Sequence, residues 1–239
     1  MNPFYAGAFA LLGGMLAASA VRGGGWGWWL LWPSLSLLLL ATGFAGVGAR
    51  VLGKRPSGTL ATWAKILHSP NLIYASLVWN LVRLASREPP ISRVDDRLFL
   101  ARRLTSAEMR EDVAHIIDLT AEVDEPAGLR NHPGYICMPI LDAGIPDAEA
   151  MKRVIERVRS NSVLVHCAMG HGRTGLFALL LLAHRGQAES VAEGLAILSR
   201  SRPGIGLNRA QEQFAYEYLR TFRLKKSVEQ NLPVDGGRE

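Results

Sequence analysis

The segment from Asn161 to Leu182, NSVLVHCAMGHGRTGLFALLLL, joins two strongly apolar stretches through a short loop that contains glycine. The valine-rich residues before the loop predict a buried strand, and the long apolar run after the loop predicts a buried helix. A buried strand that runs directly into a buried helix needs other elements to cover both of its faces. This segment therefore restricts the surrounding chain to a layered α/β domain.

The same alternation of short and long apolar segments extends over residues 91–224. Strands are predicted for the stretches RLFLARRL, HIIDLTAE, GYICMPI and NSVLVHC. Helices are predicted for Thr105–Val113 and Asp147–Arg159, and then for GRTGLFALLLLAHRG, AESVAEGLAILSRSR and NRAQEQFAYEYLR. Because strands alternate with helices, we expect a compact α/β domain with a central, largely parallel sheet flanked by helices. The polar residues 225–239 are predicted to form a disordered tail.

Two uncharged apolar runs occupy the start of the chain, Phe4–Val21 with 18 residues and Trp26–Gly48 with 23 residues. As helices these runs would be roughly 27 and 34 Å long, and the hydrocarbon core of a bilayer is about 30 Å thick. Residues 1–49 are therefore predicted to form a two-helix transmembrane hairpin. Two alternatives stay open. Ala18-Ser19-Ala20 resembles a signal-peptide cleavage site, and a hairpin buried in a soluble protein would also be apolar.

The charges that follow the apolar runs orient the hairpin. Residues 50–110 contain eleven Lys or Arg and four Asp or Glu. The positive-inside rule then places the rest of the chain in the cytoplasm, and we expect an integral protein of a bacterial inner membrane. The net charge of +6 is interpreted as a sign of contact with anionic lipid headgroups rather than with nucleic acid.

Two cysteines, Cys137 and Cys167, give no disulfide framework, as expected in a reduced compartment.

A basic, amphipathic connector is predicted for residues 50–90. It contains the stretch NLIYASLVWNLVRLASR, whose helical spacing forms one polar stripe on an otherwise apolar helix. The stripe consists of Ser76, Asn80, Arg83 and Arg87. Such a helix either lies in the membrane interface, with its arginines at the headgroups, or packs on the domain core. Glu88-Pro89-Pro90 ends the helix, because a residue before proline avoids the helical conformation.

The loop HCAMGHGRT combines an anion-binding backbone with a nucleophile. Ala168, Gly170 and Gly172 allow successive N–H groups to turn inward, and the start of the next helix adds partial positive charge. The Arg173 guanidinium matches two oxygens of a phosphate group, and the same positive field favours the thiolate form of Cys167. A thiolate at the floor of a phosphate-binding loop indicates nucleophilic attack on phosphorus.

The order and spacing of these residues resemble those of the cysteine-dependent protein tyrosine phosphatase superfamily. The resemblance is carried by His166, Cys167, Gly170, Arg173 and Thr174, and the size of the region resembles the dual-specificity branch. It implies a two-step reaction, in which the cysteine forms a phosphocysteine and an aspartic acid protonates the leaving oxygen. It implies no metal ion and no cofactor.

The resemblance also assigns roles along the loop. The implied phosphate-binding residues are Ala168, Met169, Gly170, His171, Gly172 and Arg173. The Thr174 hydroxyl is expected to donate a hydrogen bond to the Cys167 sulfur. His166 is expected to orient the loop through a hydrogen bond.

The general acid is predicted to be Asp142, in the stretch PILDAGIPD that follows the strand GYICMPI. Asp147 is predicted to cap the next helix and is the second choice if Asp142 only belongs to a turn. Further along, SRPGIGLNRAQ resembles the segment that supports the phosphate loop. Asn208 is expected to bond to the phosphate-loop backbone and Gln211 to position water, although a helix cap at Asn208 fits the sequence as well.

We therefore expect a membrane-anchored dual-specificity-type phosphatase that acts on phosphotyrosine, phosphoserine and phosphothreonine in proteins. A phospholipid monoester such as phosphatidylglycerophosphate is the alternative substrate, because the anchor and the basic connector would hold the site near headgroups. In the family that this sequence resembles, members that act on multiply phosphorylated inositol lipids tend to carry lysines in the loop. This loop has none, so such lipids are disfavoured as substrates. A hypothesis of another class is a pseudophosphatase adaptor that binds phosphate without hydrolysing it. The sequence leaves the oligomeric state open.

Overall fold

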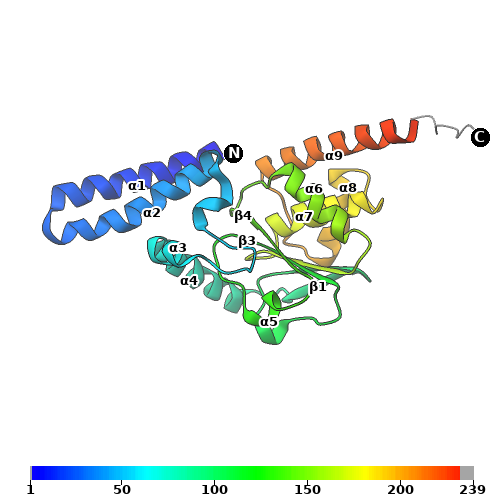
Figure 1. The fold of residues 1–239 in the computed structure, drawn as a ribbon, viewed down its shortest axis with the longest axis horizontal. Helices are drawn as coiled ribbons and strands as arrows, with labels where there is room; N and C mark the ends of the chain where they lie inside the picture. Colours follow the sequence, from blue (N-terminus) through cyan, green and yellow to red (C-terminus); the bar gives the residue numbers. More distant parts are fainter. Residues whose placement is uncertain (1, 232–239) are drawn as a thin grey trace, which may run out of the picture.

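The computed structural model describes residues 2–231, which form a layered α/β domain with a helical hairpin extending from one side (Figure 1). The central sheet has five strands in the order β1-β2-β5-β3-β4. The strands are β1 Ile91–Asp95, β2 Leu98–Ala101, β3 His115–Thr120, β4 Tyr135–Ile140 and β5 Val163–His166. Only β1 is antiparallel to its neighbour, and the other pairs are parallel. The predicted α/β fold is confirmed, and β5 lies at the centre of the sheet.

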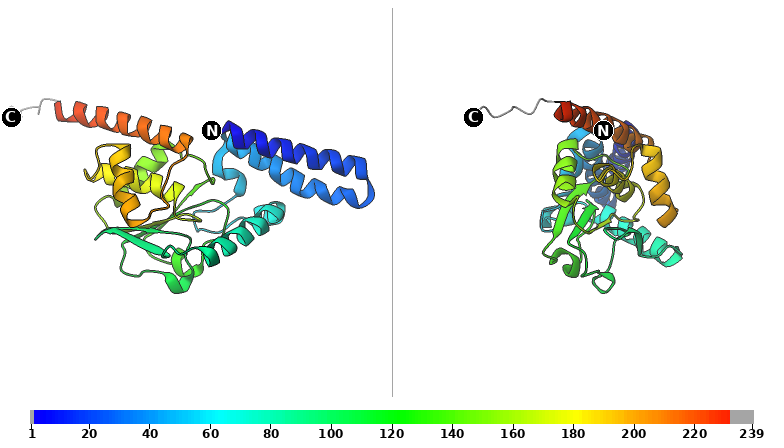
Figure 2. Two further views of the ribbon diagram at one scale, coloured as in Figure 1. Left: turned by 180° about the vertical axis from the view of Figure 1, so that it is seen from behind. Right: turned by 90° about the vertical axis from the view of Figure 1, so that its right-hand side faces the viewer.

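Four helices cover one face of the sheet (Figures 1 and 2). They are α6 Ala148–Val158, α7 Gly172–His184, α8 Val191–Ser201 and α9 Arg209–Asn231. The larger core lies between these helices and the strands, and α7 is buried from Arg173 to Leu182. α9 runs through the predicted start of the tail, residue 225, as far as Asn231, and the rest of the predicted tail lies outside the described residues.

A smaller core covers the opposite face, which receives the alternate side chains Phe99, Ile116 and Leu164 of the strands. Its cover includes the short 3₁₀ turn η4, Ser106–Glu108, and α5, Ala127–Arg130. The predicted helix Thr105–Val113 is therefore wrong. A capping box between Thr105 and Glu108 starts a helical turn, but the chain becomes extended at Met109, and this allows Val113 to reach the smaller core.

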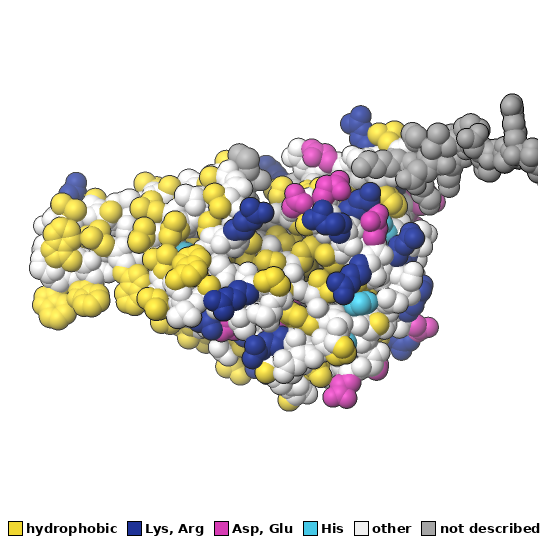
Figure 3. Space-filling model, viewed as in Figure 1, with side chains coloured by type: hydrophobic (Ala, Val, Ile, Leu, Met, Phe, Trp, Pro, Cys, Tyr) yellow, Lys and Arg dark blue, Asp and Glu magenta, His cyan; other side chains and the backbone are white. Residues whose placement is uncertain are grey.

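The N-terminal hairpin consists of two antiparallel helical segments with exposed apolar surfaces (Figure 3). Its elements are α1 Pro3–Gly23, η1 Gly25–Leu30, α2 Leu31–Thr42, η2 Gly43–Val47 and η3 Gly48–Leu52. The segments Pro3–Gly23 and Gly25–Leu52 are long and apolar enough to cross a membrane. The two arms approach closely at Gly13, whose carbonyl accepts a 2.7 Å hydrogen bond from Ser34 Oγ. A Cβ atom at Gly13 would lie 2.9 Å from Leu38 Cγ, so a larger residue would separate the arms.

The base of the hairpin packs directly on the α/β domain. Phe44 and Leu52 from the hairpin form a buried apolar cluster with Ala121 and Leu141 from the domain. Just beyond this cluster, Lys54 enters the end of the sheet. Its ammonium group lies 2.6 Å from Asp118 Oδ2 and donates to the Thr120 carbonyl at 2.8 Å. The hairpin and the domain are thus joined by an apolar contact and by a fully buried ion pair.

Two further helices follow Lys54, α3 Thr62–Leu67 and α4 Ser69–Ala85. The predicted connector helix corresponds to α4. Figure 2 shows that α4 runs from beside the hairpin to the domain.

The buried ion pair predicts a large effect of removing its cation. Lys54→Met should lower the free energy of unfolding by about 3–5 kcal/mol, because Asp118 would stay buried without a counter-charge. Lys65→Met is the matched control, since Lys65 forms an ion pair with Asp124 at the exposed surface of the same connector. That change should cost no more than about 1 kcal/mol. Chemical denaturation of the detergent-solubilised protein measures both values, and equal losses would contradict the role of Lys54.

Candidate active site

Cys167 lies at the carboxyl end of the central strand β5, directly before the loop that leads into α7. Its side chain is buried, and the Gly170 N–H donates to its Sγ atom at 3.2 Å. Gly170 has a φ of 75°, in the left-handed region that favours glycine. A Cβ atom there would also lie 2.5 Å from the Ala101 carbonyl oxygen. The loop therefore needs glycine at this position, and its backbone N–H points at the sulfur.

The loop backbone is supported by two segments that are distant in the sequence. The Arg103 N–H, just after β2, donates to the Ala168 carbonyl at 3.1 Å. The Arg202 side chain, at the end of α8, is 2% exposed and donates to the Met169 carbonyl at 3.0 Å. Both bonds hold loop carbonyl groups toward donors that lie outside the loop. They therefore help to keep the loop N–H groups pointing toward its interior.

Arg173, in the first turn of α7, is buried against Glu122. Its two terminal nitrogens donate to the two Glu122 carboxylate oxygens at 2.9 and 2.7 Å, and one of them also donates to the Ile140 carbonyl at 2.9 Å. Burial opposes ionisation of Glu122, but the charge of Arg173 outweighs it and lowers the pKa of this carboxyl group. Glu122 therefore fixes the guanidinium plane. Glu122 was not predicted as a site residue, although it is the last residue of the predicted strand HIIDLTAE, and a carboxylate at the end of a buried strand is a usable signal.

The two candidate acids have different surroundings. Asp142 follows β4, its side chain is 82% exposed, and its Oδ1 atom lies 3.1 Å from Arg173 Nη2. Asp147 accepts a 2.8 Å hydrogen bond from the Ala150 N–H and caps α6, as predicted. The geometry therefore brings Asp142, and not Asp147, to the arginine of the phosphate loop.

The turn after Asp142 is held in an unfavourable conformation by the start of α9. Ala143 has a φ of 55°, which costs a residue with a Cβ atom roughly 1–2 kcal/mol. Asn208 Nδ2 donates to the Ala143 carbonyl at 2.9 Å, and Gln211 Nε2 donates to the Gly144 carbonyl at 3.1 Å. These two bonds fix the backbone of the loop that carries Asp142.

Asn208 takes the second of its two predicted roles, that of a helix cap. Asn208 bonds to the loop of the candidate acid instead of the phosphate loop, and its Oδ1 atom also caps α9 by accepting the Gln211 N–H at 3.0 Å. The Gln211 side chain is buried and donates to the same turn, and its part in positioning water stays a prediction. Both residues support the site from the side of Asp142.

Thr174 is fully buried, and its hydroxyl has no hydrogen-bond partner among the described residues. The predicted bond to Cys167 is therefore not formed in this structure.

His171, in the phosphate loop, pairs with Glu88 from the connector, with 2.7 Å between Nε2 and Oε2. Glu88 also accepts the Gly204 N–H at 3.0 Å, so the end of the connector is attached to the loop.

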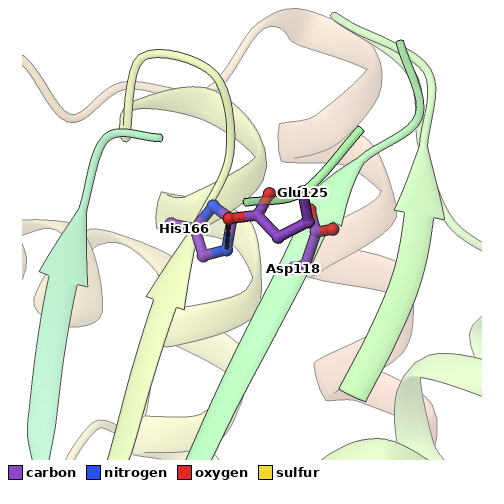
Figure 4. Close-up of side chains that lie close together, drawn as sticks. All are labelled: Asp118, Glu125 and His166. Carbon is purple, nitrogen blue, oxygen red and sulfur yellow. Dashed lines mark ion pairs between the residues drawn. The ribbon is translucent and has the colours of Figure 1, made fainter. Parts of the chain in front are cut away.

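His166 belongs to a buried polar cluster beneath the loop (Figure 4). Side-chain ligand atoms of Asp118, Glu125 and His166 lie within 4.8 Å of one another, a set that could hold a metal ion. However, the Lys54 ammonium group already supplies a cation 2.6 Å from Asp118. Burial alone would raise the pKa of Asp118, but the charge of Lys54 outweighs burial and lowers this pKa to about 2. The donor set thus fits a protein cation better than a metal ion.

The other two members of the cluster are held neutral at pH 7. Burial, reinforced by the charge of Asp118, raises the pKa of Glu125 to about 8. Burial lowers the pKa of His166 to about 4, in spite of the charge of Asp118. Lys54 and Asp118 are therefore the charged pair under the loop.

The fold resembles that of a solved phosphatase structure. PTPMT1, crystallised in complex with PI(5)P, is 14% identical over 58% of this chain and 99% of its own, with a TM-score of 0.50. Human DUSP28 is 16% identical over 57% of this chain and 97% of its own, with a TM-score of 0.49. No curated protein sequence matches the chain. At this identity the PTPMT1 match shows a common fold.

The sequence itself gives the family. Residues 101–230, more than half of the chain, match the family PTP-SAK, described as a Swiss Army Knife protein, DSP-PTPase phosphatase domain. The chain belongs to this family, and it contains a phosphatase domain of the dual-specificity type. The resemblance noted from the loop residues is thereby confirmed.

Proposed function

We propose that the protein is a membrane-anchored phosphatase that hydrolyses phosphate monoesters through a phosphocysteine at Cys167. The observation that carries this proposal is the arrangement around the sulfur. A buried Cys167 receives the Gly170 N–H, the guanidinium of Arg173 is fixed in the following turn, and Asp142 lies 3.1 Å from that guanidinium. Nucleophile, anion-binding group and acid occur together, which supports an enzyme over a pseudophosphatase adaptor.

In the first step, the Cys167 thiolate attacks phosphorus and forms an S–P bond while the bond from phosphorus to the leaving oxygen breaks. The loop N–H groups and Arg173 stabilise the charge on the three remaining phosphate oxygens. Asp142 gives its proton to the leaving oxygen, so that an alcohol or a phenol departs. Arg173 is already oriented by Glu122, and little reorganisation is therefore needed when phosphate binds.

In the second step, Asp142 takes a proton from water, the water oxygen bonds to phosphorus, and the S–P bond breaks. Inorganic phosphate leaves and Cys167 returns to the thiolate. Asp142 is exposed on a loop whose backbone is held by Asn208 and Gln211, so the carboxyl group has access to solvent while its position stays fixed.

We assign phosphorylated proteins as the substrates, with phosphotyrosine, phosphoserine or phosphothreonine as the reacting group. The hairpin acts as a transmembrane anchor in this proposal, with the phosphatase domain on the cytoplasmic side, as the basic residues 50–110 favour. The anchor then limits the enzyme to phosphoproteins that come close to the membrane.

A phospholipid monoester is the second candidate substrate, and one contact favours it. Leu141, the residue before Asp142, packs against Phe44 and Leu52 at the base of the hairpin. The catalytic loop is therefore adjacent to the segment that would enter the bilayer. A lipid phosphate in the headgroup layer would need little displacement to reach it.

The role of Asp142 predicts a dependence on the leaving group. Asp142→Asn should lower kcat/KM, which reports formation of the phosphocysteine, by about 100-fold or more for an alkyl phosphate, whose leaving oxygen needs a proton, and by much less for p-nitrophenyl phosphate. Asp147→Asn is the matched control, because asparagine also caps helices well, and its kcat/KM should stay near that of the wild type. Steady-state kinetics on both esters measures this. A uniform loss on the two esters in Asp142→Asn would contradict the acid role.

The substrate assignment predicts a preference between two phosphate esters. Full-length protein in mixed micelles should release phosphate with a higher kcat/KM from a phosphotyrosyl peptide than from phosphatidylglycerophosphate. Cys167→Ser provides the blank, since a serine hydroxyl is a far weaker nucleophile at neutral pH. A higher kcat/KM for the lipid would overturn the protein assignment and support the second candidate.

A further inference from the structure

The connector helix α4 exposes its apolar face instead of packing that face against the protein. None of its residues is buried, and most of its large apolar side chains are exposed. Ile73 is 69% exposed, Leu77 57%, Leu81 58% and Leu84 84%. A surface helix of a soluble protein turns such an apolar face toward the core. In α4 this face points away from the rest of the protein.

The opposite, more polar face of α4 contacts the phosphatase domain. Arg83 Nη2 lies 3.6 Å from Glu108 Oε1, next to the turn that follows β2. The guanidinium groups of Arg83 and Arg103 lie 5.4 and 4.9 Å from the ring centre of Trp79. The helix is thus attached to the domain through ionic and cation–π contacts. Of the polar stripe, Arg83 faces the protein and Ser76 is half-buried, whereas Asn80 and Arg87 are exposed; the rest of the outer surface of α4 is mainly apolar.

The start of α4 is attached to the hairpin. His68 Nδ1 lies 2.8 Å from Ser36 Oγ of α2, and Asn71 Nδ2 donates to the same oxygen at 2.7 Å. Nearby, Trp32 Nε1 donates to the carbonyls of Ile66 and Leu67 at 3.1 Å. These bonds satisfy polar groups among apolar surfaces, as between helices in a membrane. The apolar face of α4 therefore begins beside a segment long and apolar enough to span the bilayer.

We propose that α4 is inserted obliquely into the membrane interface, with its apolar face toward the lipid chains and its polar face toward the phosphatase domain. This inference rests on the proposed membrane anchorage of the hairpin. The occupant of the apolar face is the bilayer, because the exposed surface continues that of the hairpin. Exposed Trp63 and Ile66 of α3 extend the same surface between the two.

Insertion of α4 sets the height of the active site above the membrane. Three residues after the helix ends, Glu88 pairs with His171 of the phosphate loop at 2.7 Å and accepts the Gly204 N–H at 3.0 Å. The loop is thus attached through a short segment to a helix seated in the interface. This attachment holds the opening of the phosphate loop near the level of the lipid headgroups.

Spin labels on single cysteines test this placement in full-length protein reconstituted into phosphatidylethanolamine–phosphatidylglycerol vesicles. The background carries Cys137→Ser and Cys167→Ser, and the label is attached at Leu77→Cys. Leu11→Cys, on the exposed surface of α1, is the lipid control, and Glu156→Cys, on α6, is the water control. Collisions with oxygen report lipid, and collisions with a water-soluble nickel chelate report water.

We expect the label at position 77 to behave like that at position 11, with high oxygen and low nickel accessibility, and the label at position 156 to show the reverse. Labels at Leu81→Cys and Leu84→Cys should agree with position 77, which covers the case that one variant does not fold. If position 11 is in lipid and positions 77, 81 and 84 are in water, the inference is wrong while the anchorage stands. If position 11 is also in water, the anchorage itself fails. Protection of position 77 from both reagents would indicate contact with another protein copy and would also overturn the inference.

Discussion

The bidentate ion pair between Arg173 and Glu122 connects the parts of the active site. Arg173 belongs to the first turn of α7, Glu122 follows β3, and the same guanidinium contacts the last carbonyl of β4 and the carboxylate of Asp142. The guanidinium group of Arg173 therefore holds together three neighbouring elements at the carboxyl ends of the strands. A planar fork with several fixed donors is the property that distinguishes arginine from lysine here. Without Glu122, a buried guanidinium would lack its main counter-charge.

A second buried ion pair, between Lys54 and Asp118, links this site to the N-terminal hairpin. It lies under His166, at the end of the strand next to β5, and it is accompanied by the apolar contact of Phe44 and Leu52 with Leu141. The segment that follows the hairpin is consequently part of the scaffold of the phosphatase domain. In the proposed function this matters because a rigid junction gives the site a defined position relative to the bilayer, which a flexible linker would not provide.

The sequence predicted the features that are local in the chain. The strand, the loop and the helix around Cys167 are contiguous, so their patterns could be interpreted without knowledge of the tertiary structure. The cap formed by Asp147 is local for the same reason. Glu122, Lys54 and Glu88 were missed, because each acquires its role through a partner far away in the sequence, which periodicity does not reveal.

Two other differences have physical causes of the same kind. The helix predicted for Thr105–Val113 has good starting signals, but tertiary packing of Val113 requires an extended chain after the first turn. The polar stripe on α4 could be recognised from the sequence. Helical spacing separates a polar face from an apolar face, but it does not show what each face contacts. Only the partners in the folded protein, Glu108 for Arg83 and Arg103 for Trp79, show which side of α4 meets the domain and which side is left exposed.

The most direct test of this account is to trap the covalent intermediate. Full-length protein is mixed with a ³²P-labelled aryl phosphate, denatured within one turnover and digested, and the labelled peptide is identified by mass spectrometry. The account predicts phosphate on the peptide that contains Cys167, and no label in Cys167→Ser. Continued turnover without a label on Cys167, or a label on another residue, would contradict it.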